Sequence, residues 1–234
     1  MLVVDKPAGL HTAPLRPGET GTLLEMVIAE FPEVAAVPGV KPVEPGLVHR
    51  LDRGTSGLVV VARTAEAFAA LRGLFAAGGA RKVYLAACAC ASGAVGEGER
   101  VRIVSRFAPF GAGRRMVRVV LPEESSGRLL RQAARETYAT EAEISRGGPG
   151  RALLSARIER GFRHQVRAHL AFLGYPILGD LLYGAPVPEG YPRRMYLHAA
   201  RIEMTHPLTG KALIVESPAP AEFGALFPGS SGAP

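Results

Sequence analysis

Residues 46–63 join a charged turn to an apolar run, and this junction constrains the fold more than any other stretch. A single carboxylate, Asp52, is followed at once by the turn residues Gly-Thr-Ser-Gly at 54–57. Glycine tolerates positive φ, and serine and threonine bond to their own backbone, so these residues predict a tight loop. The β-branched run 58–62 predicts a buried strand. We therefore expect Asp52 on a loop that a core strand fixes and that faces a cleft.

Two arginines, Arg50 and Arg53, flank this carboxylate. Their charges can hold an acid ionised, which suits a catalytic group. A structural salt bridge in a turn explains the same residues equally well.

The stretch 49–58, His-Arg-Leu-Asp-Arg-Gly-Thr-Ser-Gly-Leu, resembles the H-R-L-D-x-x-T-S-G-L signature of the RluA-type pseudouridine synthases, the RluA, RluC and RluD group. Other stretches resemble the same family in the same order, from about residue 2 to about residue 223. They are Lys6-Pro-Ala-Gly9 after a short strand, Lys82-Val-Tyr84, residues 160–170, and the loop 173–184.

The motif at 160–170 departs from the family pattern T-G-R-x-H-Q-I-R-x-H by two non-conservative replacements. It keeps Gly161, His164, Gln165, Arg167 and His169, while Arg160 and Phe162 replace the threonine and the first arginine. Apolar spacing predicts a helix from about residue 164, with Arg163 and Arg167 on one face. His164 and His169 are too far around such a helix to form a paired zinc face.

The order of predicted elements favours an α+β fold with a largely antiparallel sheet, because strands outnumber helices and do not alternate with them. The resemblance implies the pseudouridine synthase fold, with a mixed central sheet, flanking helices and a central cleft. We expect one catalytic domain over 1–227 and a disordered tail over 228–234. The small RNA-binding domain that many members carry in front is absent here, so we expect a minimal member or a truncated N-terminus.

Local signals predict the individual elements. A capping box at Thr22 and apolar spacing predict a helix over 23–31, and Thr64 predicts a second helix to about residue 77. We expect an exposed loop at 125–133 and a turn at 146–150. Predicted strands cover residues 2–10, 58–62, 81–88, 99–107, 116–121, 136–144, 152–158, 197–204 and 212–216, and Gly111, Gly113, Arg114 and Arg115 predict a basic turn.

The charge balance favours an anionic partner. The net charge is +7, which suits nucleic acid, although an alanine-, glycine- and arginine-rich composition without functional meaning gives the same value. The two cysteines, Cys88 and Cys90, are too close along one strand for a disulfide, so we expect reduced thiols, no metal site and a cytoplasmic protein. No signal peptide and no apolar run of about 20 residues is apparent, so we expect no membrane contact.

The resemblance implies isomerisation of uridine to pseudouridine in ribosomal or transfer RNA, without cofactor or metal, by a protein that we expect to be monomeric. Asp52 would act as nucleophile or take a ribose proton, and the residues leave this choice open. Tyr84 would stack on the uracil, although a half-buried strand tyrosine explains it too. Arg167 would pair with Asp52 at about 2.7–3.2 Å. The expected RNA-binding residues are Arg50, Arg53, Arg163 and His164.

The resemblance implies that Arg50 fills the space that the flipped base leaves, and an ion pair with Asp52 is the alternative role. Two other readings of the whole chain remain. The first is an RNA-binding protein that keeps the fold but lacks catalysis. A hydrolase using Ser56 and a histidine would need a G-x-S-x-G elbow, and the spacing around Ser56 does not fit one.

Overall fold

A computed structural model describes residues 1–90, 96–123, 127–148 and 150–227. The chain forms two compact units. The first unit comprises Met1–Val83 and Leu197–Pro218, and the second comprises Tyr84–Tyr196 and Ala219–Pro234. Strand β3 (Ala80–Ala89) begins in the first unit and ends in the second.

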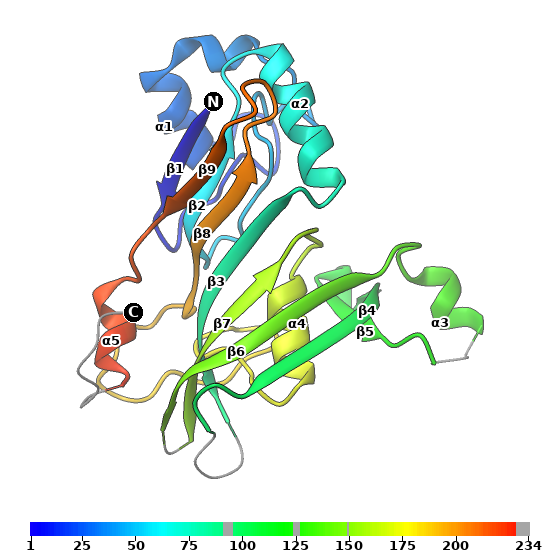
Figure 1. Cartoon of the computed structure of the whole chain (residues 1–234), viewed down its shortest axis with the longest axis vertical. Helices are drawn as coiled ribbons and strands as arrows, with labels where there is room; N and C mark the ends of the chain where they lie inside the picture. The colour runs from blue at the N-terminus through cyan, green and yellow to red at the C-terminus, as the bar shows by residue number, and fades with distance from the viewer. Residues whose placement is uncertain (91–95, 124–126, 149, 228–234) are drawn as a thin grey trace. The chain divides into compact units, whose positions relative to one another are not determined.

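The first unit is built on a mixed sheet. Strand β1 (Leu2–Lys6) pairs antiparallel with β2 (Ser56–Val61), and β2 pairs parallel with β8 (Leu197–Thr205). Strand β9 (Ala212–Glu216) forms an antiparallel hairpin with β8, as the sequence predicted (Figure 1). The β1–β2 pairing places Lys6, at the end of β1, opposite Gly57, where the Asp52 loop ends.

Two helices and a short 3₁₀ turn complete this unit. Helix α1 (Leu23–Glu30) has the predicted capping box between Thr22 and Glu25 and is followed by the 3₁₀ turn η1 (Pro32–Ala36). Helix α2 (Ala65–Ala76) is capped by Thr64, and both predicted helices are confirmed. The apolar stripe of α2 buries Leu71 and Phe75 in a core that also contains Val60 and Ile202.

The second unit contains an antiparallel sheet in the order β7-β6-β4-β5. Its strands are β4 (Arg100–Phe110), β5 (Met116–Val120), β6 (Tyr138–Gly148) and β7 (Arg151–Ile158). A short 3₁₀ turn, η2 (Ala112–Arg114), links β4 to β5. Helix α4 (Gln165–Phe172) packs Ala168 against a cluster that includes Ile103, Phe107, Val117 and Val119.

Three local predictions differ from the structure. The expected loop 125–133 contains a short helix, α3 (Gly127–Gln132), whose end is closed by a bond from the Ala133 amide to the Leu129 carbonyl; residues 125 and 126 lie outside the described residues. The expected turn at 146–150 begins later than predicted, because β6 continues to Gly148, across a register shift after Ile144; residue 149 lies outside the described residues. Helix α5 (Ala221–Ala225) was not predicted, and it contributes Phe223 to a core cluster with Tyr196.

The mixed sheet of the first unit, the antiparallel sheet of the second and the few short helices confirm the α+β class. Both cysteines are buried and free, as predicted. The single-domain boundary at 1–227 stays a prediction, and the expected disordered tail lies outside the described residues.

Candidate active site

The loop that carries Asp52 is fixed by hydrogen bonds on both sides of the carboxylate. The Thr12 hydroxyl donates to the Leu51 carbonyl at 2.7 Å and accepts from the Leu51 amide at 3.2 Å. On the other side, the Thr55 amide donates to the Asp52 carbonyl at 3.1 Å, which closes a turn. The backbone of this loop is therefore held in one conformation.

Lys6 is fully buried at the end of β1 and also supports this loop. Its ammonium group donates to the carbonyls of Pro7, Leu10 and Arg53 at 2.9, 2.8 and 3.2 Å. The Gly9 amide donates to the same Arg53 carbonyl at 2.8 Å. The Lys-Pro-x-Gly stretch thus anchors the segment that carries Asp52, a role that the sequence did not reveal because it depends on contacts far along the chain.

The two arginines that flank Asp52 bond to other groups in the first unit. Arg50 pairs with the buried carboxylate of Glu44 at 2.6 Å, so the structure gives it an acidic partner different from Asp52. The Arg53 Nε donates to the Gly9 carbonyl at 2.9 Å, while its side chain stays exposed. Sequence adjacency therefore did not indicate where these guanidinium groups point.

His49 precedes the loop and is a neutral hydrogen-bond acceptor. Its Nε2 accepts from the Val60 amide at 3.1 Å, and its ring stacks on Phe75 with centroids 5.0 Å apart. Burial, followed by the positive charges of Lys82 and Arg72, lowers the pKa of His49 to about 3. An uncharged ring at this position ties the start of the motif to strand β2.

Ser56 and His198 form a buried pair that joins β2 to β8. The Ser56 Oγ lies 2.9 Å from Nδ1 of His198, whose Nε2 donates to the Ser217 carbonyl at 3.2 Å. The serine and the histidine are 4% and 1% exposed, so this pair lies away from solvent. At Gly57, with φ of 107°, a Cβ atom would lie 2.3 Å from the Ala199 carbonyl oxygen, so only glycine fits. The pair therefore fastens strands, which does not favour the hydrolase reading.

Tyr84 lies on the part of β3 that belongs to the second unit and is 8% exposed. Two residues earlier, in the first unit, Lys82 is also buried, and its ammonium lies 4.9 Å from the centroid of the Phe75 ring. The stacking of Tyr84 on a uracil is not tested by the structure and stays a prediction.

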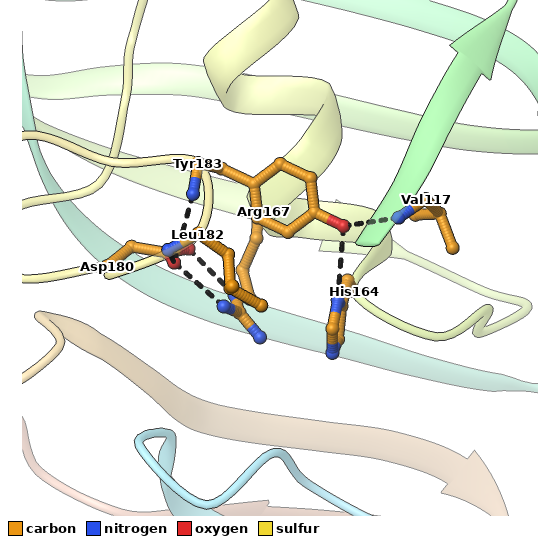
Figure 2. Close-up of polar contacts among 6 residues, drawn as sticks. All are labelled: Val117, His164, Arg167, Asp180, Leu182 and Tyr183. Carbon is orange, nitrogen blue, oxygen red and sulfur yellow. Dashed lines mark hydrogen bonds and ion pairs between the residues drawn. The ribbon is translucent and has the colours of Figure 1, made fainter. Parts of the chain in front are cut away.

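Arg167 projects from α4 and binds the buried carboxylate of Asp180 through two hydrogen bonds (Figure 2). Nε donates to Oδ2 and Nη2 to Oδ1, both at 2.7 Å. Asp180 Oδ1 also accepts from the amides of Leu182 and Tyr183 at 2.9 and 3.3 Å. Burial by itself raises the pKa of Asp180, but the hydrogen bonds and charge of Arg167, with those amides, bring it below its ordinary value.

Sequence reasoning missed Asp180 as the partner of Arg167. The available signal was Gly179-Asp180-x-x-Tyr183-Gly184, which resembled the family but was interpreted only as a loop. Asp52 and Arg167 belong to different units, and the expected contact between them stays a prediction.

Tyr183 links the start of α4 to strand β5. Its hydroxyl accepts from the Val117 amide at 2.6 Å and lies 3.1 Å from Nδ1 of His164, while its ring lies 5.3 Å from the Arg167 guanidinium carbon (Figure 2). His164 has a left-handed backbone, with φ of 58°, and directly precedes the helix. The helix therefore starts at Gln165, so the prediction that Arg163 shares a helical face with Arg167 is wrong.

Other residues of the 160–170 motif fix α4 on the sheet. His169 lies 2.8 Å from the Ser105 hydroxyl and 2.7 Å from that of Thr140, and burial lowers its pKa to about 4. Gln165 donates to the Ala139 carbonyl at 2.9 Å. Arg163 stays exposed, and its Nη2 donates to the carbonyls of Arg114 and Met116.

The two non-conservative replacements in this motif have visible structural roles. Phe162 stacks on Phe107 with centroids 5.0 Å apart and lies 5.0 Å from the ring of Tyr138. Arg160 pairs with Glu136, and its guanidinium lies 5.5 Å from the Tyr138 ring centroid. Phe162 is thus a packing residue, and Arg160 is held at the edge of the same aromatic cluster.

No group of three histidine, cysteine or acidic side chains able to hold a metal ion occurs within the described residues. Among the residues that the structure describes, no helix is long and apolar enough to cross a membrane.

Comparison with known proteins identifies the family. A family model for RNA pseudouridylate synthase matches residues 1–172. The ribosomal large subunit pseudouridine synthases D of Nitrosomonas europaea and Pseudomonas aeruginosa are each 32% identical to this chain, over 97% and 95% of it. An uncharacterized RNA pseudouridine synthase of Chloroflexus aurantiacus is 35% identical over 94%. The chain spans 62%, 67% and 63% of the lengths of these three relatives.

Solved structures support the same fold. The human RNA pseudouridylate synthase domain containing 4 matches with a TM-score of 0.70 and 20% identity, covering 95% of this chain and 86% of its own. The human RNA pseudouridylate synthase domain containing 1 matches with a TM-score of 0.66 and 24% identity, covering 92% and 78%. The sequence match over residues 1–172, together with the relatives above 30% identity, shows that this chain belongs to the RNA pseudouridylate synthase family.

Proposed function

We propose that this chain converts uridine to pseudouridine in RNA, with Asp52 as the catalytic carboxylate. In this reaction the bond between C1′ and N1 breaks, the uracil turns, and a bond forms between C1′ and C5, while the C5 proton is lost and N1 gains one. The observation that carries the proposal is the motif loop itself, whose backbone is held by Lys6 and Thr12 on either side of the one motif carboxylate.

The reaction is an isomerisation, so it needs no water as reactant and no change of oxidation state. We propose no cofactor and no metal for it. Asp52 either attacks the ribose or the uracil as a nucleophile, or removes a ribose proton as a general base. Both roles need an ionised, oriented carboxylate.

Arg167 and Tyr84 are proposed to complete the catalytic set. A guanidinium has five N–H donors, and the contact with Asp180 uses two of them, so the same side chain can serve a second carboxylate. We propose that it orients Asp52. We further propose that the ring of Tyr84 stacks on the target uracil, with an aromatic face that suits any base.

The proposed substrate is structured RNA, and large-subunit ribosomal RNA is the first choice. The names of several relatives state that class, and the net charge of +7 is compatible with it. A uridine in such RNA must leave its stack to reach the half-buried Asp52 carboxylate. We propose Arg50, Arg53, Arg163 and His164 as RNA contacts, and a monomer that acts in the cytoplasm.

The test measures release of tritium from RNA labelled at C5 of uridine, on transcripts of large-subunit ribosomal RNA and of transfer RNA. Wild type should release tritium from one class of transcript. Asp52→Asn should fold and bind that RNA but lower the rate by at least about a thousandfold, because removal of an essential catalytic group costs this much or more.

The matched control is Glu66→Gln, which removes an exposed carboxylate from α2 in the same unit. It should retain the wild-type rate within about twofold. An Asp52→Asn rate within tenfold of wild type would refute the assignment of Asp52. A wild-type chain that binds RNA tightly but releases no tritium from either transcript would support the non-catalytic RNA-binding alternative.

A further inference from the structure

The hairpin of β4 and β5 has an unusual distribution of charge. Residues 100–122 contain six arginines and no aspartate or glutamate. The two arginines nearest the start of β4, Arg100 and Arg102, pair with Glu143 and Glu141 on the neighbouring strand β6. These pairs neutralise the base of the hairpin.

The four arginines nearer the tip are Arg106, Arg114, Arg115 and Arg118. Within the described residues, no acidic side chain forms an ion pair with them. In the strand register, Arg118 lies opposite Ala108 and Arg106 lies opposite Val120, so these two arginines share one face of the hairpin. Arg114, Arg115 and Arg118 are exposed. The charge of the hairpin is therefore concentrated toward one end.

The turn that presents Arg114 and Arg115 is held in an unusual conformation. Gly111 and Gly113 have φ of 77° and 62°, and Arg114, which is not glycine, has φ of 56°. The left-handed conformation is unfavourable for residues other than glycine, and it persists where surrounding contacts enforce it. Arg163 supplies such contacts, with hydrogen bonds of 2.8 and 3.1 Å from Nη2 to the carbonyls of Arg114 and Met116.

The same turn is tied to the helix that carries Arg167. The Val117 amide donates to the Tyr183 hydroxyl at 2.6 Å, and Tyr183 in turn contacts His164 at the start of α4 (Figure 2). The hairpin tip and the guanidinium of Arg167 therefore belong to one connected set of contacts in the second unit. A cationic surface held in this way loses little conformational freedom on binding.

We propose that the tip formed by Arg114, Arg115 and Arg118 binds backbone phosphates of the RNA substrate. This inference rests on the proposed function and adds a docking surface to it. Guanidinium groups match phosphate oxygens in a bidentate geometry. Phe110, which is 49% exposed and pairs with Met116 at the closing end of the hairpin, offers a ring on which a base can stack.

The experiment compares two double variants that change net charge by the same amount. Arg114→Gln/Arg115→Gln alters the tip, and Arg100→Gln/Arg102→Gln alters the base of the same hairpin. The dissociation constant for the RNA substrate is measured between 50 and 250 mM salt, together with kcat and KM. Each lost phosphate contact lowers the salt slope by about 0.7–0.9, so the tip variant should lose about 1.4–1.8.

At 0.1 M salt this loss corresponds to roughly 25- to 60-fold weaker binding, with kcat at saturating RNA within twofold of wild type. The base variant should bind within about threefold of wild type, because its arginines are already paired. Arg118→Gln lies on regular extended backbone, so it tests the loss of a phosphate contact without disturbing the turn. It should lower the salt slope by about 0.7–0.9, the contribution of one contact.

Equal losses from the tip and base variants would overturn the inference, because they would reflect net charge alone. Wild-type binding by the tip variant would also overturn it and would leave an acidic protein as the alternative partner of this surface. Failure of this inference can be distinguished from failure of the proposed function. If wild type makes no pseudouridine but the tip variant still loses RNA affinity and salt slope, the proposed function fails and the docking surface stands.

Discussion

The guanidinium of Arg167 and the carboxylate of Asp180 form a two-point ion pair in the interior of the second unit, with both hydrogen bonds at 2.7 Å. Their side chains are 8% and 0% exposed. The orientation of Arg167 is therefore set within its own unit by an acid thirteen residues further along the chain. An arginine oriented in this way can offer its remaining N–H donors to a second partner.

Breaking this pair from either side should be costly. Asp180→Ala and Arg167→Met should each lower the free energy of unfolding by about 3–5 kcal/mol, because each leaves an uncompensated buried charge. Urea denaturation measures both values. The double variant Arg167→Met/Asp180→Leu should lose less than the sum of the two single variants, since no charge remains buried. Arg102→Gln, from an exposed pair with Glu141, should cost less than about 1 kcal/mol. Single-variant losses below 1 kcal/mol would contradict this account.

Two buried histidines should make stability depend on pH. The pKa of His49 is lowered to about 3 and that of His169 to about 4, both chiefly by burial, from an ordinary value of 6.5. The unfolded chain therefore binds protons below pH 6.5 that the folded chain does not bind. Stability is fully present above pH 6.5 and falls by about 1.4 kcal/mol per pH unit for each histidine as the pH drops toward its folded pKa.

The measurement is the free energy of unfolding at intervals from pH 7.5 to 4.5. His49→Gln and His169→Gln should each reduce the slope below pH 6.5 by about 1.4 kcal/mol per pH unit, whatever their effect at neutral pH. An unchanged slope in both variants would show that these rings are protonated in the folded protein.

Removal of the buried ammonium of Lys6 should affect both stability and the proposed activity. Lys6→Met leaves the carbonyls of Pro7, Leu10 and Arg53 without this donor, and we expect a loss of about 3 kcal/mol in stability. Tritium release should fall by roughly one to two orders of magnitude, because small displacements of a reacting group are costly. Lys211→Met, in the exposed β8–β9 turn, is the control and should change neither quantity. Full activity in a stably folded Lys6→Met would show that the Asp52 loop does not need this anchor.

Restoring the family arginine at position 162 should not help this chain. Phe162→Arg removes the stacked contact with Phe107 and puts a charge against Tyr138, so it should cost about 1–3 kcal/mol of stability. Thermal melting measures the loss, and Phe162→Leu, which keeps the apolar contact, should lose less. A gain in both stability and tritium release for Phe162→Arg would show that the aromatic cluster is not the reason for phenylalanine here.

Substitutions of Tyr84 separate the ring from its hydroxyl. Tyr84→Phe should keep RNA affinity and lower kcat if the hydroxyl assists loss of the C5 proton. Tyr84→Ala should also weaken capture of the flipped base, by about 1–3 kcal/mol, or roughly 5- to 150-fold in KM. Tyr191→Phe, at a partly exposed tyrosine in the second unit, is the control and should behave as wild type. A fully active Tyr84→Ala would leave Tyr84 with a role in the sheet alone.

The sequence predicted elements whose signals are local. The N-caps and apolar spacing of α1 and α2, and the alternation in β8 and β9, are settled within a dozen residues, and the structure has these elements at nearly the predicted bounds. Helix α3 was missed because it is six residues long and its sequence carries arginines and no clear apolar face. The end of β6 was missed because cross-strand pairing with β7 holds glycines that favour a turn.

Side-chain partners were harder to predict, because they depend on distant parts of the chain. Arg50 lies two residues from Asp52, yet its acidic partner is Glu44. Arg167 was assigned to Asp52 by resemblance, and the ion pair with Asp180 went unnoticed. The sequence identified which polar residues matter but did not indicate which of them meet.

The support of the Asp52 loop by Lys6 and Thr12 also has a consequence for the order of folding. These contacts join residues 47 and 39 positions apart in sequence. The chain between them must be closed into a loop before either contact forms, and contacts of such separation form slowly compared with a helical turn. The loop therefore takes its final shape with the docking of β1 on β2, whereas α1 and α2 depend on caps and hydrogen bonds between residues a few positions apart.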